Sequence, residues 1–559
     1  MSVKQEKPLV PYPTVDISTL NAAAALMGSA LGSAHVRTQP PVIEQYGRTS
    51  GGTAIFPAAV VFPASTAEVR QVVEIAAKFR IGLYPISRGC NWGYGDAAAA
   101  RPGQVIVDLR RMNRVIEINR DLAYAVIEPG VTQQQLHEAL EGTGLWMDAT
   151  GAGLNASIVG NTLDRGFGHS RYGARTDSVG NFEVVLGDGR VITTGYGSLP
   201  NARAAHVYPE GVGPSLDGLF VQSSFGIVTR MTVWLMPEPE AFAGFFISTE
   251  DDEAIGDLVE RLGRLRRAGM LQSNVHIGND LRLLAARMQY PWDRAGGVTP
   301  LPPELRRELR REQGLGAWAA AGAIYGTRKS IAAVREALRH ALPRDRYEFA
   351  VVDDRRLRSA KAFSHVLPRF GFGRRLAQQI DTVQTAIDLL RGKPTDHPLY
   401  GTAWRVRDRV APEVHDPLEI HAGLMWIAPV LPQTAADCRE LLALMQPVFD
   451  QHGFDMPVTF TMINERALIC ISNISFDQRE PEDRQRAAEC YQQLMTKLTE
   501  RGCYPYRTPP APQGLAHLMT PGDPAIWDIQ REIKGVFDPH GILSRGRYEP
   551  PPPEPPPPV

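Results

Sequence analysis

The chain has 559 residues, more than one hydrophobic core normally organises, so its length predicts two or more domains. Its 60 Lys and Arg residues balance 61 Asp and Glu residues to a formal net charge of -1, which excludes the basic surface of a nucleic-acid binder or of a protein held on an anionic membrane. With 43% hydrophobic and 22% charged residues, the composition is globular. Five widely spaced cysteines form no CxxC pair, so we expect no disulfide framework, no metal site and a reducing, cytoplasmic location.

Shifts in composition divide the chain into five segments of an α+β protein. Residues 1–44 are expected to form an N-terminal arm without a signal peptide or a membrane span. Two domains follow over residues 45–240 and 241–500. Residues 501–548 are too few to fold alone, so this C-terminal segment should pack back on the two domains. The tail, residues 549–559, is proline-rich and predicts an extended end.

The first domain opens with a strand, a helix and a second strand. The run AVVFP at residues 59–63 predicts a strand, and IGLYPIS at residues 81–87 predicts the next one. Between them, Ser65 and Glu68 have the spacing of a capping box, and the helix that they begin carries one apolar face, made of Val69, Val72, Val73 and Ala76. The second strand ends in the glycine-rich loop SRGCNWGYG, at the edge of a βαβ unit where ligands usually bind. Strands are then predicted in VIVDL, VIEIN and YAVIEPG.

Three loops of this domain combine glycines with polar side chains. Residues 87–95 offer consecutive backbone amides that could wrap a pyrophosphate, although a tight turn would also use such glycines. Residues 159–173 and 223–229 form the second and third loops. A loose GxGxxA match at residues 151–156 has no apolar strand before it and no clear helix after it, so a Rossmann nicotinamide site is not predicted.

The second domain mixes helices and strands. LPPELRRELRREQG at residues 301–314 predicts a helix, AWAAAGAIYG at residues 317–326 a strand, and VREALRHAL at residues 334–342 a helix. Further strands are predicted around WIAPVLP and LICISNI. This pattern favours a separate α+β domain that lies over the first.

Ten segments of the chain resemble, in the same order, the vanillyl-alcohol oxidase and p-cresol methylhydroxylase family of flavoproteins. They are PISRGCNWGYG, VIVDLRRMNRVIEIN, VIEPGVT, VGNTLDRGFGHSRYG, EVVLGDGRVITTG, GPSLDGLFVQSSFGIVTRMTVWLMP, GAWAAAGAIYGT, WIAPV, YPYRT and DPHGILSRGR. The likeness covers residues 54–548. It implies a p-cresol-methylhydroxylase-type FAD-binding domain, a cap domain over the isoalloxazine ring, and oxidation of para-substituted phenols at the benzylic carbon.

The resemblance also assigns the cofactor contacts. The positions that match FAD-contacting segments of the family are Ser87, Arg88, Gly89, Cys90, Asn91, Glu128, Pro129, Gly130, Gly160, Asn161, Gly166, Gly226, Ile227 and Val228. Arg547 stands where the family has a basic residue near the flavin, and a cation there could stabilise negative charge on the reduced ring.

Tyr94, Tyr506 and Arg507 match the three residues that bind the substrate phenol in the family. Two phenolic hydroxyls can hydrogen-bond an anionic oxygen, and a permanently charged guanidinium lowers the pKa of the bound phenol. A phenolate pushes electron density toward the para carbon, which eases hydride departure to the flavin and yields a quinone methide. Water can then add to give a hydroxylated product, whereas an alcohol substrate collapses to the aldehyde.

The chain departs from the family at the positions of covalent flavin attachment. Leu424 stands where the oxidases carry the linking histidine, and His421 lies three residues earlier. Asp416 stands where the methylhydroxylase carries a linking tyrosine. We therefore expect FAD to be bound non-covalently.

A second departure concerns the proton acceptor near the flavin. The oxidases place an acid before the GN motif, but residues 149–163 contain none. His169 is a candidate general base or proton relay, with a purely structural histidine as the alternative.

These departures favour a hydroxylase or dehydrogenase that passes electrons to a cytochrome or another acceptor protein. An oxygen-using oxidase of the vanillyl-alcohol or eugenol type remains an alternative, and so does a flavin-binding protein that has lost catalysis. The other expected partners are a small phenolic substrate and further copies of the chain, since family members are dimers or larger.

Overall fold

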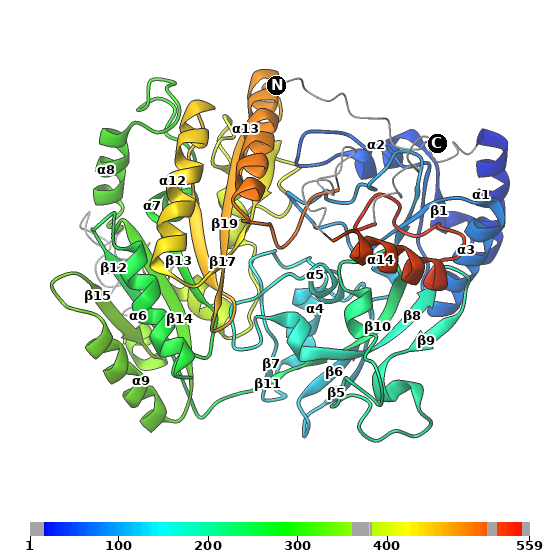
Figure 1. Ribbon diagram of the computed structural model, residues 1–559, viewed down its shortest axis with the longest axis horizontal. Helices are drawn as coiled ribbons and strands as arrows, with labels where there is room; N and C mark the ends of the chain where they lie inside the picture. The colour runs from blue at the N-terminus through cyan, green and yellow to red at the C-terminus, as the bar shows by residue number, and fades with distance from the viewer. Residues whose placement is uncertain (1–15, 360–379, 381–382, 511–522, 550–559) are drawn as a thin grey trace.

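The structure is a computed structural model that describes residues 16–359, 380, 383–510 and 523–549. The first 15 residues of the predicted arm and residues 550–559 of the predicted tail lie outside this range. Figure 1 shows two halves side by side, one built mainly from the first part of the chain and one from residues 241–500. The mixture of mostly antiparallel sheets and covering helices confirms the predicted α+β class. No helix among the described residues is long and apolar enough to cross a membrane.

The first sheet contains the predicted βαβ unit. Its strands lie in the order β1 (Val36–Arg37), β2 (Ala59–Val61), β4 (Val105–Asp108) and β3 (Leu83–Ile86), and both β2 and β3 run parallel to β4. Helix α3 (Thr66–Phe79) connects β2 to β3 and buries the predicted apolar face. The capping box is only half formed, because Ser65 accepts from the Glu68 amide while the Glu68 carboxylate accepts from the Ala64 amide, one residue before the expected donor.

Residues 17–44 are part of this first layer rather than a separate arm. Helix α1 (Ile17–Leu31) packs on α3 and buries Ala23 and Met27 in the same core, while β1 pairs with β2. Helix α2 (Pro40–Gly47) follows. Apolar residues spaced along α1 explain the difference, since they cover the outer face of α3.

A second, antiparallel sheet completes the first half of the molecule. Its order is β5 (Val115–Asn119), β6 (Tyr124–Ile127), β10 (Gly226–Trp234), β8 (Val179–Leu186) and β9 (Val191–Thr193). The short pair β7 (Leu145–Trp146) and β11 (Met236–Pro237) lies outside it, as do the helices α4 (Gln133–Leu140) and α5 (Ile158–Leu163).

The second half is built on one eight-stranded sheet. The strands are β15 (Glu348–Val352), β12 (Ala241–Thr249), β14 (Trp318–Gly326), β13 (Val275–Asn279), β18 (Val458–Met462), β19 (Ala467–Asp477) and β16 (Ala422–Ile427), with β17 (Val430–Pro432) paired to β19. Its helices include α6 (Ile255–Arg267), α7 (Asp280–Ala285), α8 (Pro303–Glu312), α9 (Arg328–Ala341), α12 (Ala435–Gln451) and α13 (Pro481–Glu500).

The two faces of this sheet differ in what covers them. Side chains such as Ile277, Phe460 and Cys470 enter one core together with residues of α6, α12 and α13. Because side chains alternate along a strand, His276 and its register partner Thr461 point to the opposite face. The ring of His276 there contacts His169 of the first half. This second face therefore lies toward the loops of the first half.

The C-terminal segment connects both halves. Pro505 forms a bridge to Pro429 of the second half, and Leu543 forms one to Leu83 of the first. Between them, helix α14 (Pro524–Phe537) packs through Phe537 on Phe220. In Figure 1 this helix lies in front of the first half.

Candidate active site

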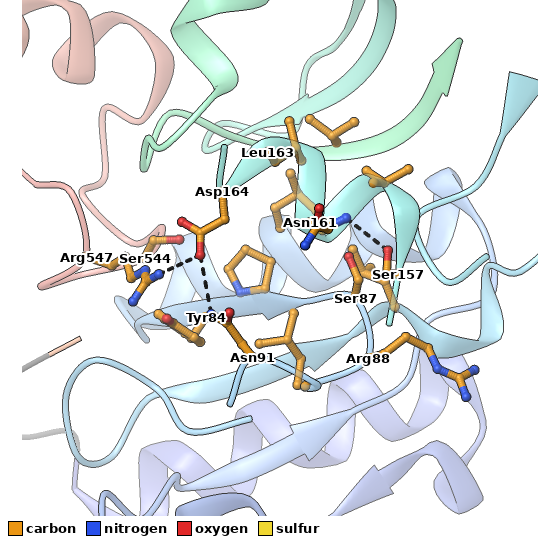
Figure 2. Close-up of a pocket in the computed structure, with 18 of the residues that line it drawn as sticks. Tyr84, Ser87, Arg88, Asn91, Ser157, Asn161, Leu163, Asp164, Ser544 and Arg547 are labelled. Carbon is orange, nitrogen blue, oxygen red and sulfur yellow. Dashed lines mark hydrogen bonds and ion pairs between the residues drawn. The ribbon is translucent and has the colours of Figure 1, made fainter. Parts of the chain in front are cut away.

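One cleft in the first half collects most of the predicted cofactor residues (Figure 2). Its walls come from the loop after β3, from α5 with residues 163–164, from the start of β10 and from residues 544–548. The free space is about 1090 Å³, including its open mouth. The loop lies at the carboxyl end of a parallel strand, the position that the sequence predicted for ligand binding.

The loop after β3 presents unused backbone donors to this cleft. The amides of residues 88–91 donate no hydrogen bond to any residue that the structure describes. Gly89 has φ of 75°, and a Cβ on it would lie 2.7 Å from the Cβ of Ala97. A side chain there would therefore be strained and would push the loop away from its neighbour. The loop fits the pyrophosphate of a dinucleotide, which needs several amide donors and close approach of the backbone.

Helix α5 forms the opposite wall. Its N-cap residue Ser157 accepts a hydrogen bond from the Gly160 amide at 2.9 Å and donates its hydroxyl to the carbonyl of Pro129 at 2.6 Å. A Cβ on Gly160 would lie 2.8 Å from Ser87 Oγ, so glycine lets this helix approach the loop across the cleft. The EPG turn thus positions α5 from behind.

The cleft brings together twelve of the predicted site residues but not all of them. Those that line it are Ser87, Arg88, Gly89, Cys90, Asn91, Gly160, Asn161, Gly226, Ile227, Val228, Arg507 and Arg547. Glu128, Pro129, Gly130 and Gly166 are not among the lining residues. Glu128 instead pairs with Arg114 at 2.7 Å. A Cβ on Gly166 would lie 2.2 Å from the side chain of Asn161, so this glycine makes room for a predicted cofactor residue.

An ion-pair network around Asp164 occupies one end of the cleft (Figure 2). Its Oδ2 lies 2.6 Å from Arg507 Nη2 and 2.8 Å from Arg547 Nη2, and the hydroxyl of Tyr548 donates to Oδ1 at 2.7 Å. Burial alone would raise the pKa of Asp164, but the two guanidinium groups outweigh it and lower the pKa to about 2. Asp164 is thus a carboxylate that fixes both cations.

Tyr94, Tyr506 and Arg507 lie together beside this network. The guanidinium carbon of Arg507 is 4.3 Å from the ring centroid of Tyr94. Burial raises the pKa of Tyr94 well above its ordinary value, so its hydroxyl stays protonated and can donate. Arg507 uses Nε and Nη2 to bind Asp164 and Asn91, and its Nη1 has no partner among the described residues.

His169 meets a second histidine that the sequence did not indicate. The ring centroids of His169 and His276 are 4.4 Å apart. Phe167 lies between His276 and Tyr506, with centroid distances of 6.5 and 5.7 Å. Burial lowers the pKa of His169 to about 4 and that of His276 well below its ordinary value. Both rings are therefore neutral at pH 7, and the buried Nε2 of His276 has no hydrogen-bond partner in the described structure.

Asp96 is another site residue that the sequence reasoning missed. It lines the cleft, where its Oδ2 accepts from the amide and the hydroxyl of Ser50 at 2.6 and 2.8 Å. Its Oδ1 is buried and has no partner among the described residues, and burial raises its pKa to about 7. An orphaned polar atom on the wall fits a ligand that carries hydroxyl donors, such as the ribityl chain of FAD. Its signal was an acid directly after the glycine loop.

The three positions at or near the family's sites of covalent flavin attachment differ in burial and in hydrogen bonding. Leu424 is buried, and its amide donates to the Ser50 carbonyl at 2.8 Å. Asp416 accepts from the indole of Trp92 at 3.1 Å. His421 is exposed, and the part of the cleft wall that the structure describes contains no histidine.

Comparison with known proteins agrees with this geometry. Residues 57–195 match a family model described as an FAD binding domain. The chain is 34% identical to 1'-carboxy-chondrochloren decarboxylase of Chondromyces crocatus over 95% of this chain and 97% of that protein. It is 29% identical to the 4-cresol dehydrogenase [hydroxylating] flavoprotein subunit of Pseudomonas putida, over 88% and 87%.

Two solved structures share the fold over nearly the whole chain. The 4-ethylphenol oxidase from Gulosibacter chungangensis, in complex with isoeugenol, superposes with a TM-score of 0.85 at 30% identity and covers 96% of this chain and 98% of its own. The p-cresol methylhydroxylase with bound substrate gives 0.84 at 26% identity, with 96% and 97% covered.

The fold and the cleft thus define an FAD-linked oxidoreductase with an antiparallel cap sheet. The chain belongs to the vanillyl-alcohol oxidase and p-cresol methylhydroxylase family of flavoproteins, which confirms the resemblance seen in its sequence.

Proposed function

We propose that the protein oxidises para-substituted phenols at the benzylic carbon. The observation that carries this proposal is the grouping of two tyrosine hydroxyls and one guanidinium, those of Tyr94, Tyr506 and Arg507, beside the cofactor cleft. Bound FAD would supply the two-electron acceptor for the hydride that leaves the substrate.

Each of the three side chains has a separate task in this proposal. Tyr94 and Tyr506 donate hydrogen bonds to the phenolic oxygen, and Nη1 of Arg507, which has no partner among the described residues, stabilises its negative charge. Asp164 holds the guanidinium in place through its other nitrogens. The bound substrate is therefore kept as a phenolate, which favours loss of hydride at the para position.

FAD is proposed to be held non-covalently by the residues that line the cleft. The free amides of residues 88–91 would bind the pyrophosphate, and Arg547 would lie near the flavin. Leu424 offers no nucleophile, and no histidine among the described residues lines the cleft. Direct contacts with FAD stay predictions for Glu128, Pro129, Gly130 and Gly166. Because these residues do not line the cleft, its geometry favours a role in supporting the residues that do.

The histidine pair is the proposed proton acceptor. His169 is neutral at pH 7, and its neighbour His276 has a free ring nitrogen. Addition of water to a quinone methide releases one proton, which a neutral imidazole can accept. If His169 has only a structural role, its replacement would leave the rate of oxidation unchanged.

Oxidative decarboxylation is the second candidate, favoured by the 34% identity to a decarboxylase over almost the full length of both chains. After hydride loss from a 4-hydroxyphenyl compound with a carboxylate on the next side-chain carbon, the carboxylate can leave as CO₂. Its bonding pair then forms the side-chain double bond, and the ring returns to phenolate. This route needs no base to remove a proton from carbon, in keeping with residues 149–163, which contain no acid.

The electron acceptor is proposed to be a protein such as a cytochrome, with oxygen as the alternative. The 4-cresol dehydrogenase relative is described as a flavoprotein subunit, which fits a protein acceptor, whereas a similar structure is that of an oxidase. The location is proposed to be cytoplasmic and the protein a homo-oligomer.

Anaerobic mixing of the FAD-loaded protein with 4-ethylphenol tests the proposal. We expect the flavin absorbance to bleach, and cytochrome c to restore it faster than air. Unchanged absorbance with all para-substituted phenols would contradict the function and favour a flavin-binding protein without catalysis. Faster recovery in air would identify an oxidase.

A further inference from the structure

Arg282 is a cation on the site-facing side of the cap sheet, and no carboxylate of the described residues pairs with it. It lies in α7, directly after β13. A Cβ on Gly278 would lie 3.5 Å from Arg282 Cγ and 3.8 Å from Thr459 Oγ1. The side chain of Arg282 therefore lies over the same face of β13 that carries His276, in the space that Gly278 leaves open.

The guanidinium is anchored at one nitrogen only. Nη2 donates to the carbonyls of Pro457 and Ile471 at 3.3 and 3.1 Å. Nε is buried without a partner, and Nη1 makes no hydrogen bond to any residue that the structure describes. Burial lowers the pKa of Arg282 to about 10, which still leaves the group charged at pH 7. The side chain as a whole is half-buried. A partly desolvated cation in this state lacks, among the described residues, the counter-charge that usually compensates its desolvation.

Three arginines that are more deeply buried, Arg175, Arg266 and Arg405, are compensated. Arg175 pairs with Asp148 at 2.9 Å, and Arg405 pairs with Asp483 at 3.4 Å. Arg266 has no carboxylate in its hydrogen-bond shell, but its three nitrogens donate to four carbonyls and to the side chain of Asn274. Arg282 has neither a carboxylate nor such a full set of acceptors.

The location of Arg282 connects it with the proposed phenol site. Its guanidinium carbon is 5.8 Å from the ring of Trp426. That ring stacks on Tyr94, with centroids 6.5 Å apart and planes at 19°. Asn473, the register partner of Trp426, adds a buried side-chain oxygen without a partner. One aromatic ring thus separates the unpaired cation from a phenol-binding tyrosine.

We propose that Arg282 binds a carboxylate on the para side chain of the substrate, so that the substrate class is a 4-hydroxyphenyl carboxylate. This inference rests on the proposed function, because the phenol end is assigned to Tyr94, Tyr506 and Arg507. The two arginines then hold the two anionic ends of one substrate. Guanidinium is suited to this task because its planar nitrogens match carboxylate oxygens.

The test compares two ligands that differ only in the anionic group. The FAD-loaded protein is titrated with 3-(4-hydroxyphenyl)propanoate and with its methyl ester, and the dissociation constants are measured by calorimetry. We expect the wild type to bind the carboxylate at least 30-fold more tightly, and Arg282→Met to lose that preference. Arg282→Lys should restore part of it. Equal binding of acid and ester by the wild type would overturn the assignment without any variant.

Arg287→Met is the matched control. Arg287 follows the same helix, and burial lowers its pKa. The only hydrogen bond of its side chain in the described structure goes to the Gln313 carbonyl. We expect this variant to keep the carboxylate preference. If both variants lose it equally, a general effect on the cap explains the loss and the proposal fails.

Oxidation of 4-ethylphenol separates this inference from the proposed function. Arg282→Met should bleach the flavin with 4-ethylphenol within about 3-fold of the wild-type rate. An equal loss of rate for 4-ethylphenol and for the propanoate would contradict a carboxylate-binding role. If neither phenol bleaches the wild type while the carboxylate is still bound preferentially, the proposed oxidation fails and the Arg282 assignment stands.

Discussion

The two sides of the site treat buried charge in opposite ways. On the cofactor side, Asp164 compensates Arg507 and Arg547 within one network. On the cap side, Arg282 and His276 carry polar nitrogens without partners in the described structure. Desolvated groups without partners cost folding free energy, so they mark the places where the protein reserves contacts for a ligand. The first side is built to be rigid, and the second to be completed by substrate.

Removal of Arg507 should give the largest effect, because it is the cation assigned to the phenolate. Arg507→Ala should slow phenol oxidation by about 30-fold to several thousand-fold, the usual range for a charged partner lost from a desolvated site. The measurement is stopped-flow flavin reduction at saturating 4-ethylphenol. Arg507→Lys should recover only part of the rate, since it keeps the charge but not the planar fork. Wild-type activity in Arg507→Ala would remove this residue from the mechanism.

Neutralising Asp164 tests whether its carboxylate balances the positive charges of Arg507 and Arg547 on the cofactor side. Asp164→Asn leaves two guanidinium groups close together without their anion, and breaking a buried ion pair costs about 3–5 kcal/mol. We expect a lower free energy of unfolding in urea and weaker FAD retention. Asp416→Asn is a control with a similar charge change outside the network. Equal stability of the two variants would show that Asp164 does not compensate the cations.

Replacing His169 tests the pair that it forms with His276 of the cap. His169→Ala should retain FAD. It should slow the turnover of a substrate that is hydroxylated at the benzylic carbon by about 100-fold or more, as expected when a general base is lost. With a folded pKa of about 4, the wild-type rate should stay level from pH 8 down to about 5 and fall below that. A rate within 2-fold of the wild type at every pH would leave His169 with a structural role.

The same histidine should affect stability within a defined pH range. The unfolded chain binds a proton at His169 below about pH 6.5, whereas the folded protein binds it only near pH 4. Protons therefore favour unfolding in this window, and stability falls as the pH drops from 6.5 toward 4. In His169→Phe, the melting temperature should fall less between pH 7 and 5 than in the wild type. His421→Phe, at an exposed position, should behave like the wild type.

Cofactor attachment gives the simplest test of the cleft. Acid precipitation should release FAD into the supernatant, because no linking residue of the family is in place. Yellow colour that stays with the precipitated protein would contradict non-covalent binding.

The sequence predicted local structure correctly where apolar residues repeat at the short spacing of a helix or a strand. The face of α3 and the strand–helix–strand order around it were read correctly, because the apolar spacing repeats within a few residues. The prediction of a separate arm was wrong for residues 17–44. Helix α1 packs on α3, and this packing depends on tertiary contacts that the local sequence pattern does not reveal.

The site was predicted only in part for a related reason. The glycine loop and the trio proposed to bind the phenol lie in recognisable segments. The structure places the loop and Arg507 on one cleft and Tyr94 beside Arg507. Asp164 was missed because the two arginines that it pairs with lie more than 340 residues away in the chain. His276 and Arg282 stand in or next to a short strand without a motif, so only the pairing of the cap sheet reveals which face they occupy.

The central claim is that the protein oxidises its substrate as a phenolate. The most direct test is anaerobic flavin reduction with 4-ethylphenol and with its methyl ether, 4-ethylanisole, which cannot ionise. The account predicts that 4-ethylphenol bleaches the flavin at least 30-fold faster, and that Arg507→Ala reduces this ratio toward one. Equal rates for the phenol and the ether in the wild type would contradict the assignment of Tyr94, Tyr506 and Arg507.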